Sequence, residues 1–274
     1  MKLSIDSKID LNNGVKIPIL GLGTWKLVGK TAYDSVKWAL EAQYRHIDTA
    51  KLYGNEEQIG KAIKDSGVLR EDVFITSKVW DSDQGYESTI RAFNRSLKRL
   101  GTSYIDLYLI HWPRKNQRIE TWKALEKIYS EGKVRAIGVS NYWIHHLEEI
   151  IGSFNIKPVI NQFELNPFLY RKELIKYCKE QDISIEAYCP LTHGKKLNNN
   201  YLKEIAEKYN KSVAQILIRW GFQHEFIEIP KSSTRDHIIQ NSMVFDFELD
   251  EEDIFKLDNM EEKYQILYDT SKWD

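Results

Sequence analysis

Residues 134–163 read VRAIGVSNYWIHHLEEIIGSFNIKPVINQF, and this stretch decides the fold class. Two short apolar runs, Val134–Val139 and Pro158–Phe163, flank Ile144–Ile151, whose apolar residues recur at helical spacing. Strand, helix and strand in this order form a parallel βαβ unit, because parallel strands need a long crossover between them. The stretch therefore predicts one repeat of an α/β fold.

The same alternation extends over most of the chain. Near the start, Lys8–Leu11 and Lys16–Ile19 flank Asn12-Asn13-Gly14, a pattern typical of a small hairpin. The eight strands expected after it are Leu20–Gly23, His46–Asp48, Phe74–Val79, Leu107–His111, Val134–Val139, Pro158–Phe163, Ser184–Tyr188 and Phe226–Ile229.

Helical patterns separate these strands. We expect helices at Thr31–Gln43, Gly85–Leu100, Gln117–Ser130, Ile144–Ile151, Lys172–Glu180, Leu202–Tyr209 and Ser212–Trp220, and a short one at Thr234–Asn241. Repeats of this kind over 274 residues favour a closed (β/α)₈ barrel with the N-terminal β-hairpin at its bottom. An open, doubly wound sheet is the alternative.

Composition and charge narrow the function classes. The chain carries 39 basic and 40 acidic side chains, a net charge of −1, so no nucleic-acid partner is expected. No signal peptide and no apolar run of about 18 residues is present, so we expect no membrane span and a cytoplasmic location. Cys178 and Cys189 are expected to be reduced thiols, with no metal bound. No linker divides the chain, which predicts a single domain over residues 1–274.

A barrel carries its chemistry at the carboxyl ends of its strands. Four side chains able to take part in proton transfer fall there: Asp48, Tyr53, Lys78 and His111. Taken singly, each has a structural explanation, such as a turn aspartate, a packing tyrosine, a surface lysine or a core histidine. All four on one rim indicate a catalytic site.

The motifs around these residues resemble those of the aldo-keto reductase family. They are Asp48-Thr49-Ala50-Lys51-Leu52-Tyr53-Gly54-Asn55-Glu56, Leu109-Ile110-His111-Trp112-Pro113, Gly138-Val139-Ser140-Asn141 and Ile229-Pro230-Lys231-Ser232. The resemblance covers nearly the whole chain and is greatest to the compact microbial branch, which includes glyoxal, methylglyoxal and 2,5-diketo-gluconate reductases. It implies hydride transfer between NADPH and a small carbonyl compound such as methylglyoxal, glyoxal, an aromatic aldehyde or a keto sugar.

The resemblance also implies roles for the four rim residues. Tyr53 would be the general acid, and a nearby ammonium, Lys78, would lower a pKa that is ordinarily about 10. Asp48 would orient Lys78, and His111 would hydrogen-bond the substrate oxygen. Trp25, Trp80 and Trp112, beside Tyr53 and His111, would wall the substrate pocket, although these tryptophans could instead pack the barrel mouth. Little chain remains after the barrel for a specificity loop, so we expect a permissive pocket.

The cofactor site implied by the resemblance lies on the same rim. Ser140, Asn141 and Gln162 would hold the carboxamide, and Tyr188 would stack on the nicotinamide. The Leu191–Lys196 loop would run near the pyrophosphate. A helix N-terminus attracts phosphate, so Lys231 and Ser232 before a short helix suit the 2′-phosphate. The expected cofactor contacts are Gly23, Thr24, Trp25, Asp48, Ser140, Asn141, Gln162, Tyr188, Cys189, Pro190, Leu191, Lys195, Lys231, Ser232, Arg235, His237, Gln240 and Asn241.

Two positions depart from the family pattern. His237 stands where arginine is usual, so discrimination against NADH should be weaker and NADH remains possible, although Arg235 could compensate. Cys189 replaces a common serine, and we expect a packing or hydrogen-bonding role for it rather than a reactive thiol.

Two further motifs of the sequence have simpler explanations than a functional site. Gly21-Leu22-Gly23 lacks the third glycine of a dinucleotide fingerprint, and His145-His146 is expected on a solvated helix face. Two other functions remain alternatives. One is a nicotinamide-binding regulatory module, and the other is a barrel isomerase or lyase that uses Tyr53 and His111 as acid and base. We expect a monomer whose partner is a small carbonyl substrate.

Overall fold

The computed structural model describes residues 3–274, and its centre is an eight-stranded parallel sheet. The strands of this sheet follow one another in chain order, each paired with the next. They are β3 (Leu22–Gly23), β4 (His46–Asp48), β5 (Phe74–Val79), β6 (Ile105–Ile110), β7 (Val134–Ser140), β8 (Ile160–Glu164), β9 (Ser184–Tyr188) and β10 (Ile227–Glu228).

The sheet closes on itself between its first and last strands. Gly21 N donates to Glu228 O at 2.8 Å, and Glu228 N donates to Ile19 O at 2.9 Å. These bonds form a parallel bridge between Leu20 and Glu228 beside β3 and β10. Closure confirms the expected (β/α)₈ barrel and excludes the open sheet.

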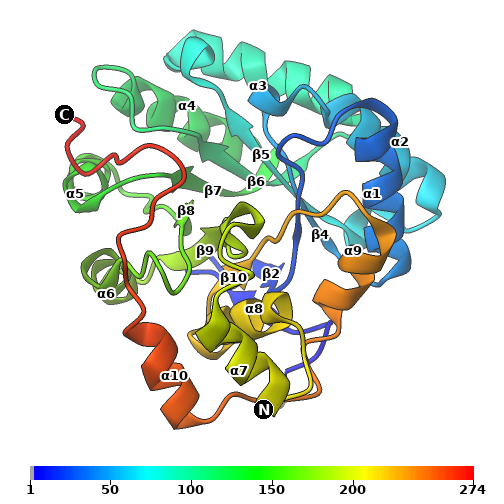
Figure 1. The fold of residues 1–274 in the computed structure, drawn as a ribbon. Helices are drawn as coiled ribbons and strands as arrows, with labels where there is room; N and C mark the ends of the chain where they lie inside the picture. Colours follow the sequence, from blue (N-terminus) through cyan, green and yellow to red (C-terminus); the bar gives the residue numbers. More distant parts are fainter. Residues whose placement is uncertain (1–2) are drawn as a thin grey trace.

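Helices surround the strands, as Figure 1 shows. Within residues 3–274, none of them is both long and apolar enough to cross a bilayer. The helices are α1 (Gly29–Glu41), α2 (Glu56–Ser66), α3 (Tyr86–Leu100), α4 (Arg118–Ser130), α5 (Ile144–Ser153), α6 (Lys172–Glu180), α7 (Asn200–Lys208), α8 (Val213–Gln223), α9 (Arg235–Ser242) and α10 (Glu251–Asp258).

Two of these helices, α2 and α10, are absent from the sequence-based expectation. In α2, Ile59, Ala62 and Ile63 are buried, but Gly60 interrupts the helical pattern. A Cβ atom at Gly60 would lie 2.2 Å from the carbonyl oxygen of Leu100, so glycine lets α2 pack directly on the end of α3. The residue that obscured the helix in the sequence is therefore the one its packing requires.

An antiparallel hairpin, β1 (Lys8–Asp10) and β2 (Lys16–Pro18), closes the bottom of the barrel. Leu11 and Ile17 are buried in one cluster with inward-facing apolar residues of the barrel strands, including Leu107, Ile160 and Ile227. This confirms the position expected for the hairpin. The bottom of the interior is thus apolar, and polar side chains lie nearer the opposite end.

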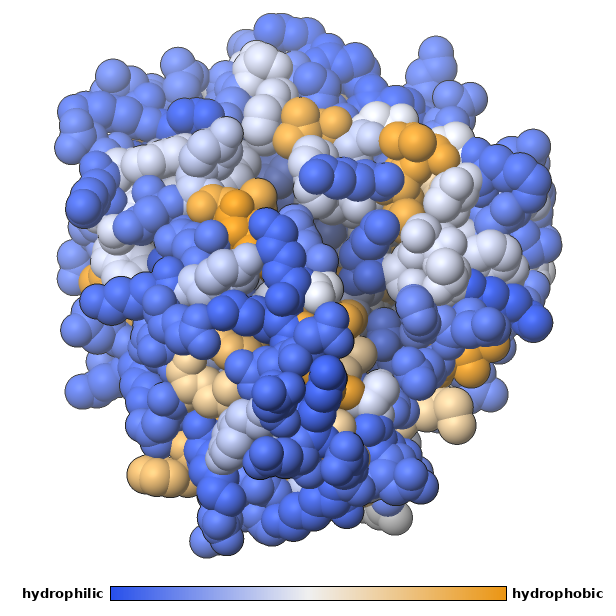
Figure 2. All heavy atoms as spheres, viewed as in Figure 1, coloured by the Kyte–Doolittle hydropathy of each residue, from blue (hydrophilic) through white to orange (hydrophobic). Residues whose placement is uncertain are grey.

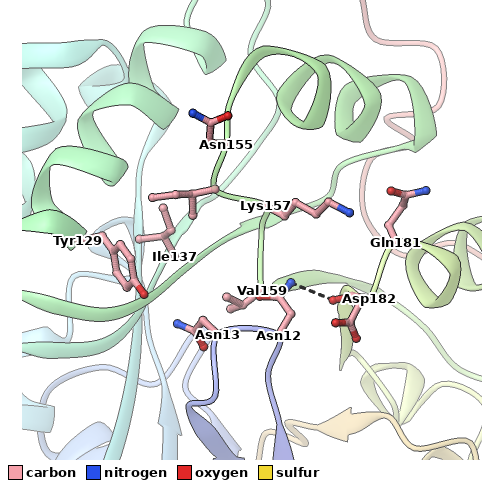
Figure 3. A pocket seen from close by; sticks show the side chains of 10 residues that line it. Asn12, Asn13, Tyr129, Ile137, Asn155, Lys157, Val159, Gln181 and Asp182 are labelled. Atoms are coloured by element: carbon pink, nitrogen blue, oxygen red, sulfur yellow. Dashed lines mark hydrogen bonds between the residues drawn. The ribbon is translucent and has the colours of Figure 1, made fainter.

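A pocket of about 360 Å³ lies beside the hairpin (Figure 3). Asn12 and Asn13 from the hairpin, Val159 before β8 and Asp182 before β9 contribute to its lining. Asn12 Nδ2 donates to Asp182 O at 2.9 Å. The pocket therefore lies at the amino ends of the strands, away from the side chains described next.

Candidate active site

Lys78, near the carboxyl end of β5, lies at the centre of a buried polar cluster. Its side chain is fully buried, and Nζ donates to Asp48 Oδ2 at 2.6 Å and Oδ1 at 2.8 Å. The same nitrogen lies 3.0 Å from Thr49 O and 3.4 Å from the Tyr53 hydroxyl. The structure thus brings the Lys78 ammonium to the carboxylate at the end of β4 and the phenol of the loop after it, which lie 30 and 25 positions away in the chain.

The loop after β4 is held in place by its own polar side chains. Tyr53 ends a short 3₁₀ helix, η1 (Lys51–Tyr53). Thr49 Oγ1 donates to Asn55 Oδ1 at 2.7 Å, and Asn55 Nδ2 donates to the carbonyl oxygens of Thr24 at 3.0 Å and Leu27 at 2.9 Å. Because Asn55 is buried and ties this loop to the loop after β3, Tyr53 has a fixed position over Lys78.

His111 follows β6 and faces Tyr53 across the mouth of the barrel. Their ring centroids are 5.8 Å apart, and the His111 ring lies 5.2 Å from that of Trp80. Burial and the charge of Lys78 lower the pKa of His111 well below its ordinary value, so the ring is neutral near pH 7. Its Nδ1 atom is buried and has no hydrogen-bond partner within residues 3–274.

The expected lowering of the Tyr53 pKa is wrong for this structure. Burial raises the pKa of Tyr53 well above its ordinary value, and the carboxylate of Asp48 raises it further. Lys78 does not offset these effects, because both Asp48 oxygens lie closer to Nζ than the phenol does. Tyr53 is therefore a protonated phenol at neutral pH.

Polar groups from three neighbouring strands meet beside this cluster. Asn141 Nδ2 donates to His111 O and to Ser140 Oγ, both at 3.0 Å, and the Tyr188 hydroxyl donates to Asn141 Oδ1 at 2.6 Å. Gln162 Nε2 donates to Asp48 Oδ2 at 2.9 Å. The four side chains that the sequence assigned to the nicotinamide end thus lie together on one rim.

Three lysines gather where the sequence predicted the pyrophosphate. After the effect of burial, the charges of Lys26, Lys195 and Lys231 all lower the pKa of His193. Within residues 3–274, none of the three lysines forms an ion pair. Cations without a carboxylate partner fit a diphosphate, so these residues fit a dinucleotide.

Lys26 was missed in the sequence, whereas His193 lies inside the loop of residues 191–196 that was expected near the pyrophosphate. Both have left-handed backbone angles, with φ of 63° and 52°, as do Asn141 and Cys189 on the same rim. Such residues are uncommon and concentrate at functional sites. Backbone angles of this kind leave no signal in composition or spacing, so only the position of Lys26 just after Gly23, Thr24 and Trp25 could have pointed to it.

Cys189 lies at the start of the loop that contains Pro190 and Leu191. Its Sγ atom lies 3.1 Å from His193 Nε2, and Asn166 Nδ2 donates to its carbonyl oxygen. Burial raises the pKa of the Cys189 thiol above its ordinary value. A thiol of this kind is a poor nucleophile, in line with the hydrogen-bonding role expected for it.

The residues expected near the adenine and the 2′-phosphate lie on or just before α9. Ser232 Oγ accepts from Thr234 N at 3.2 Å where the helix begins. Arg235 is exposed and lies 3.5 Å from Glu41 on α1. His237 and Gln240 are also exposed, whereas Asn241 is buried. Arg235 and His237 are thus both accessible to a phosphate in solution.

Aromatic rings surround the mouth of the barrel. The Trp25 ring lies 4.9 Å from that of Tyr53, and Trp112 stacks with His111 at 6.1 Å. With Trp80, these side chains border the position between Tyr53 and His111. Figure 2 shows that this face is hollowed above the strands, with pale and orange side chains around the hollow.

The segment after α10 also contributes to this wall, which the sequence reading did not anticipate. Ile266 N and Leu267 N donate to the Glu164 carboxylate at 2.8 and 2.9 Å. The rings of Tyr268 and Trp273 lie 5.7 and 5.5 Å from that of Trp112. In Figure 1 this red segment runs from α10 past β8 toward α5.

The two adjacent histidines of α5 hold the same segment. The Trp273 carbonyl oxygen lies 2.8 Å from His145 Nε2 and 3.0 Å from His146 Nε2. His146 is fully buried, and its Nδ1 accepts from Trp143 N. The expectation of a solvated helix face is therefore wrong for His146, because residues 266–274 cover it.

A closed barrel with ionisable side chains and unpaired lysines, within residues 3–274, at the carboxyl ends of its strands fits the expected barrel oxidoreductase. The model of the aldo/keto reductase family matches residues 19–262. A glyoxal reductase of Bacillus subtilis (strain 168) is 52% identical over 267 residues, which are 97% of this chain and 97% of that protein.

Solved structures agree with this match. MGS-M4, an aldo-keto reductase from a Medee basin deep-sea metagenome library, has a TM-score of 0.95 at 48% identity, covering 97% of this chain and 99% of that one. A Bombyx mori aldo-keto reductase in complex with NADP has a TM-score of 0.91 at 34% identity, covering 98% and 97%. The chain belongs to the aldo/keto reductase family and is an NAD(P)H-dependent oxidoreductase.

Proposed function

We propose that this enzyme reduces small aldehydes and ketones to alcohols with NADPH, and that Tyr53 is the general acid. The observation that supports this most directly is the position of Lys78 Nζ, 2.6 Å from Asp48 and 3.4 Å from the Tyr53 hydroxyl, with His111 opposite. Proton transfer by a side chain positioned in this way typically raises the reaction rate by a factor of about 10²–10⁴.

The reaction adds a hydride to the carbonyl carbon and a proton to the carbonyl oxygen. When bound beside this cluster, a reduced nicotinamide would supply the hydride and would itself be oxidised. Tyr53 supplies the proton: its O–H bond breaks, a new O–H bond forms on the substrate, and solvent later returns a proton to the phenolate. A ring N–H of the neutral His111 donates to the carbonyl oxygen and fixes its position.

The raised pKa of Tyr53 is compatible with this role. Hydride addition produces an alkoxide, which is a strong base, and Tyr53 still carries its proton at neutral pH. A protonated phenol beside that oxygen can therefore supply the proton that it needs. Lys78 then stabilises the phenolate from 3.4 Å until it is protonated again.

The aromatic rings at the mouth favour small dicarbonyl compounds and aromatic aldehydes as substrates. Trp25, Trp80 and Trp112 present flat apolar surfaces around Tyr53 and His111, and the similarity to a glyoxal reductase supports a small dicarbonyl substrate. Aromatic walls of this kind bind planar, partly apolar molecules. Methylglyoxal, glyoxal, aromatic aldehydes and keto sugars are the proposed substrates.

NADPH is the proposed cofactor, with NADH as a weaker second. Lys231, Ser232 and Arg235 lie at the start of α9, where a 2′-phosphate would meet the helix N-terminus. The nearby His237 is exposed and adds no permanent charge. The complex of the Bombyx mori relative with NADP supports the phosphorylated form.

The test is the oxidation of NADPH by purified enzyme with glyoxal, methylglyoxal and an aromatic aldehyde. Tyr53→Phe should lower kcat by about 10²–10⁴ while NADPH still quenches tryptophan fluorescence. Tyr108→Phe is the matched control, because Tyr108 is equally buried but packs against Phe93 of α3, away from the mouth of the barrel. Full turnover in Tyr53→Phe would exclude Tyr53 as the acid.

We also propose that residues 1–274 form one domain and that the enzyme acts as a monomer in the cytoplasm. Both Cys178 and Cys189 are free thiols in the structure, which supports a reducing compartment. Sedimentation at micromolar concentration tests the monomer, and a dimer would contradict it.

A further inference from the structure

A second buried polar layer lies beneath Asp48 and Lys78, on the side of the hairpin. His46, Thr76 and Glu186 each stand two residues before Asp48, Lys78 and Tyr188 on β4, β5 and β9, and all three are buried. Side chains two positions apart on a strand share a face, so this layer also lines the barrel interior. The proton transfer described above does not use it.

Gln162 joins this layer to the catalytic cluster. Its Nε2 atom donates to Asp48 Oδ2 at 2.9 Å and to Glu186 Oε2 at 2.8 Å. Both N–H groups of the amide are thereby directed at carboxyl groups, which fixes the amide orientation and leaves its carbonyl oxygen for another donor. Gln162 is also the residue expected to hold the nicotinamide carboxamide.

The two buried carboxyl groups of Asp48 and Glu186 thus lie in one cluster with a single ammonium, that of Lys78. Lys78 contacts Asp48 through both oxygens, whereas the contacts of Glu186 within residues 3–274 are with Gln162 and His46 and include no ammonium or guanidinium. A buried carboxylate without a counter-ion is so costly that it takes up a proton instead. Burial and the charge of Asp48 accordingly raise the pKa of Glu186 to about 8.

The hydrogen-bond pattern shows which oxygen carries the proton. Glu186 Oε2 accepts from Gln162, so it is the carbonyl oxygen of the acid. Among the residues that the structure describes, no group donates to Oε1, which lies 3.4 Å from His46 Nε2. That nitrogen in turn lies 3.0 Å from Thr76 Oγ1. Burial and Lys78 lower the pKa of His46 to about 3, so the ring is neutral.

We propose that Glu186 is a positioning residue for the reaction: it carries a proton on Oε1, orients the Gln162 amide, and leaves Asp48 as the only negative charge beside Lys78. The groups that face it are His46 and Asp48 from β4, Thr76 and Lys78 from β5, and Gln162 from β8. This inference rests on the proposed function. Ionisation of Glu186 adds a second negative charge beneath Asp48, and that charge raises the pKa of Tyr53 further and weakens it as an acid.

The kinetic test compares Glu186→Gln with Glu228→Gln across pH. Glu228 is an equally buried carboxyl on the next strand, but it lies against Gly221 of α8, on the outer side of the sheet. In the wild type and in Glu228→Gln, the reductive kcat should fall by roughly threefold or more between about pH 6.5 and about pH 9. Glu186→Gln should keep most of its neutral-pH kcat and lose this fall, because the amide cannot ionise. An unchanged profile, or a uniform loss at every pH, would overturn the proposal.

A measurement on the free protein separates this inference from the proposed function. Carbon-13 labelling of the glutamate carboxyl carbons gives a resonance that is assigned by its absence from Glu186→Gln. At about pH 6.5 this resonance should have the shift of a protonated acid, and it should titrate above neutrality. An ionised shift at neutral pH would overturn the inference even if the enzyme reduces carbonyls. A protonated shift would support it even if no substrate is turned over.

Discussion

Replacing Lys78 with methionine tests whether Lys78 contributes separately to stability, through its ion pair with Asp48, and to turnover, through the proton transfer from Tyr53. The substitution removes the contacts of Nζ with Asp48 at 2.6 and 2.8 Å and leaves that carboxylate buried without a counter-ion. Breaking a buried pair in this way costs about 3–5 kcal/mol of unfolding free energy. For a chain of this size, the loss corresponds to a drop in Tm of roughly 10 °C.

Adding Asp48→Asn should recover most of that stability but none of the turnover. The asparagine removes the uncompensated charge, and its carbonyl oxygen can still accept from Gln162 Nε2. The positive charge beside Tyr53 stays absent, so kcat should remain about 10²–10⁴ below that of the wild type in both variants.

Urea unfolding followed by tryptophan fluorescence measures the stability of each variant, and NADPH oxidation at a temperature where all of them are folded measures turnover. A double variant no more stable than Lys78→Met would show that Asp48 is not the source of the cost. A double variant with wild-type turnover would show that Lys78 takes no part in the proton transfer.

Three other substitutions have expected outcomes that follow from named contacts. Gly221→Ala should lower the urea midpoint by the equivalent of about 2 kcal/mol, because the alanine Cβ would lie 1.6 Å from Glu228 Oε1. Alanine usually stabilises a helix relative to glycine, so a stabilised variant would contradict this prediction. In Glu164→Gln, the amide oxygen can accept from only one of the Ile266 and Leu267 N–H groups, so the segment that borders the mouth is held less firmly. KM should then rise more for an aromatic aldehyde than for glyoxal, and equal changes in both KM values would refute this prediction. His237→Arg should tighten NADPH by about three- to tenfold and leave NADH nearly unchanged, as measured by fluorescence titration; parallel gains for both cofactors would show that His237 does not face the 2′-phosphate.

The strands could be predicted because each carries a strong local signal. β5 and β6 are rich in apolar residues and buried over their whole length, and the predicted and observed bounds of β5 agree. Parallel pairing then places the carboxyl ends of neighbouring strands at one edge. Asp48, Lys78 and His111 could therefore be grouped on one rim from their positions alone.

The parts that could not be predicted depend on tertiary contacts. Residues 266–274 have no hydrophobic period, and their place is set by the Glu164 carboxylate and the α5 histidines, which are about a hundred residues or more away in the chain. The direction of the Tyr53 pKa shift depends on burial, which no local pattern gives. The buried layer of His46 and Glu186 was missed because each residue lies inside a strand, where a single polar side chain gives no sign of its partner.

The way residues 266–267 attach to the barrel bears on how substrate preference can diverge among relatives. Glu164 accepts hydrogen bonds from main-chain N–H groups, which every amino acid except proline provides. Side chains in this segment can consequently be exchanged without loosening its anchor. Substitutions in this segment can thus change which metabolite the mouth of the pocket accepts, without changing Asp48, Tyr53, Lys78 or His111.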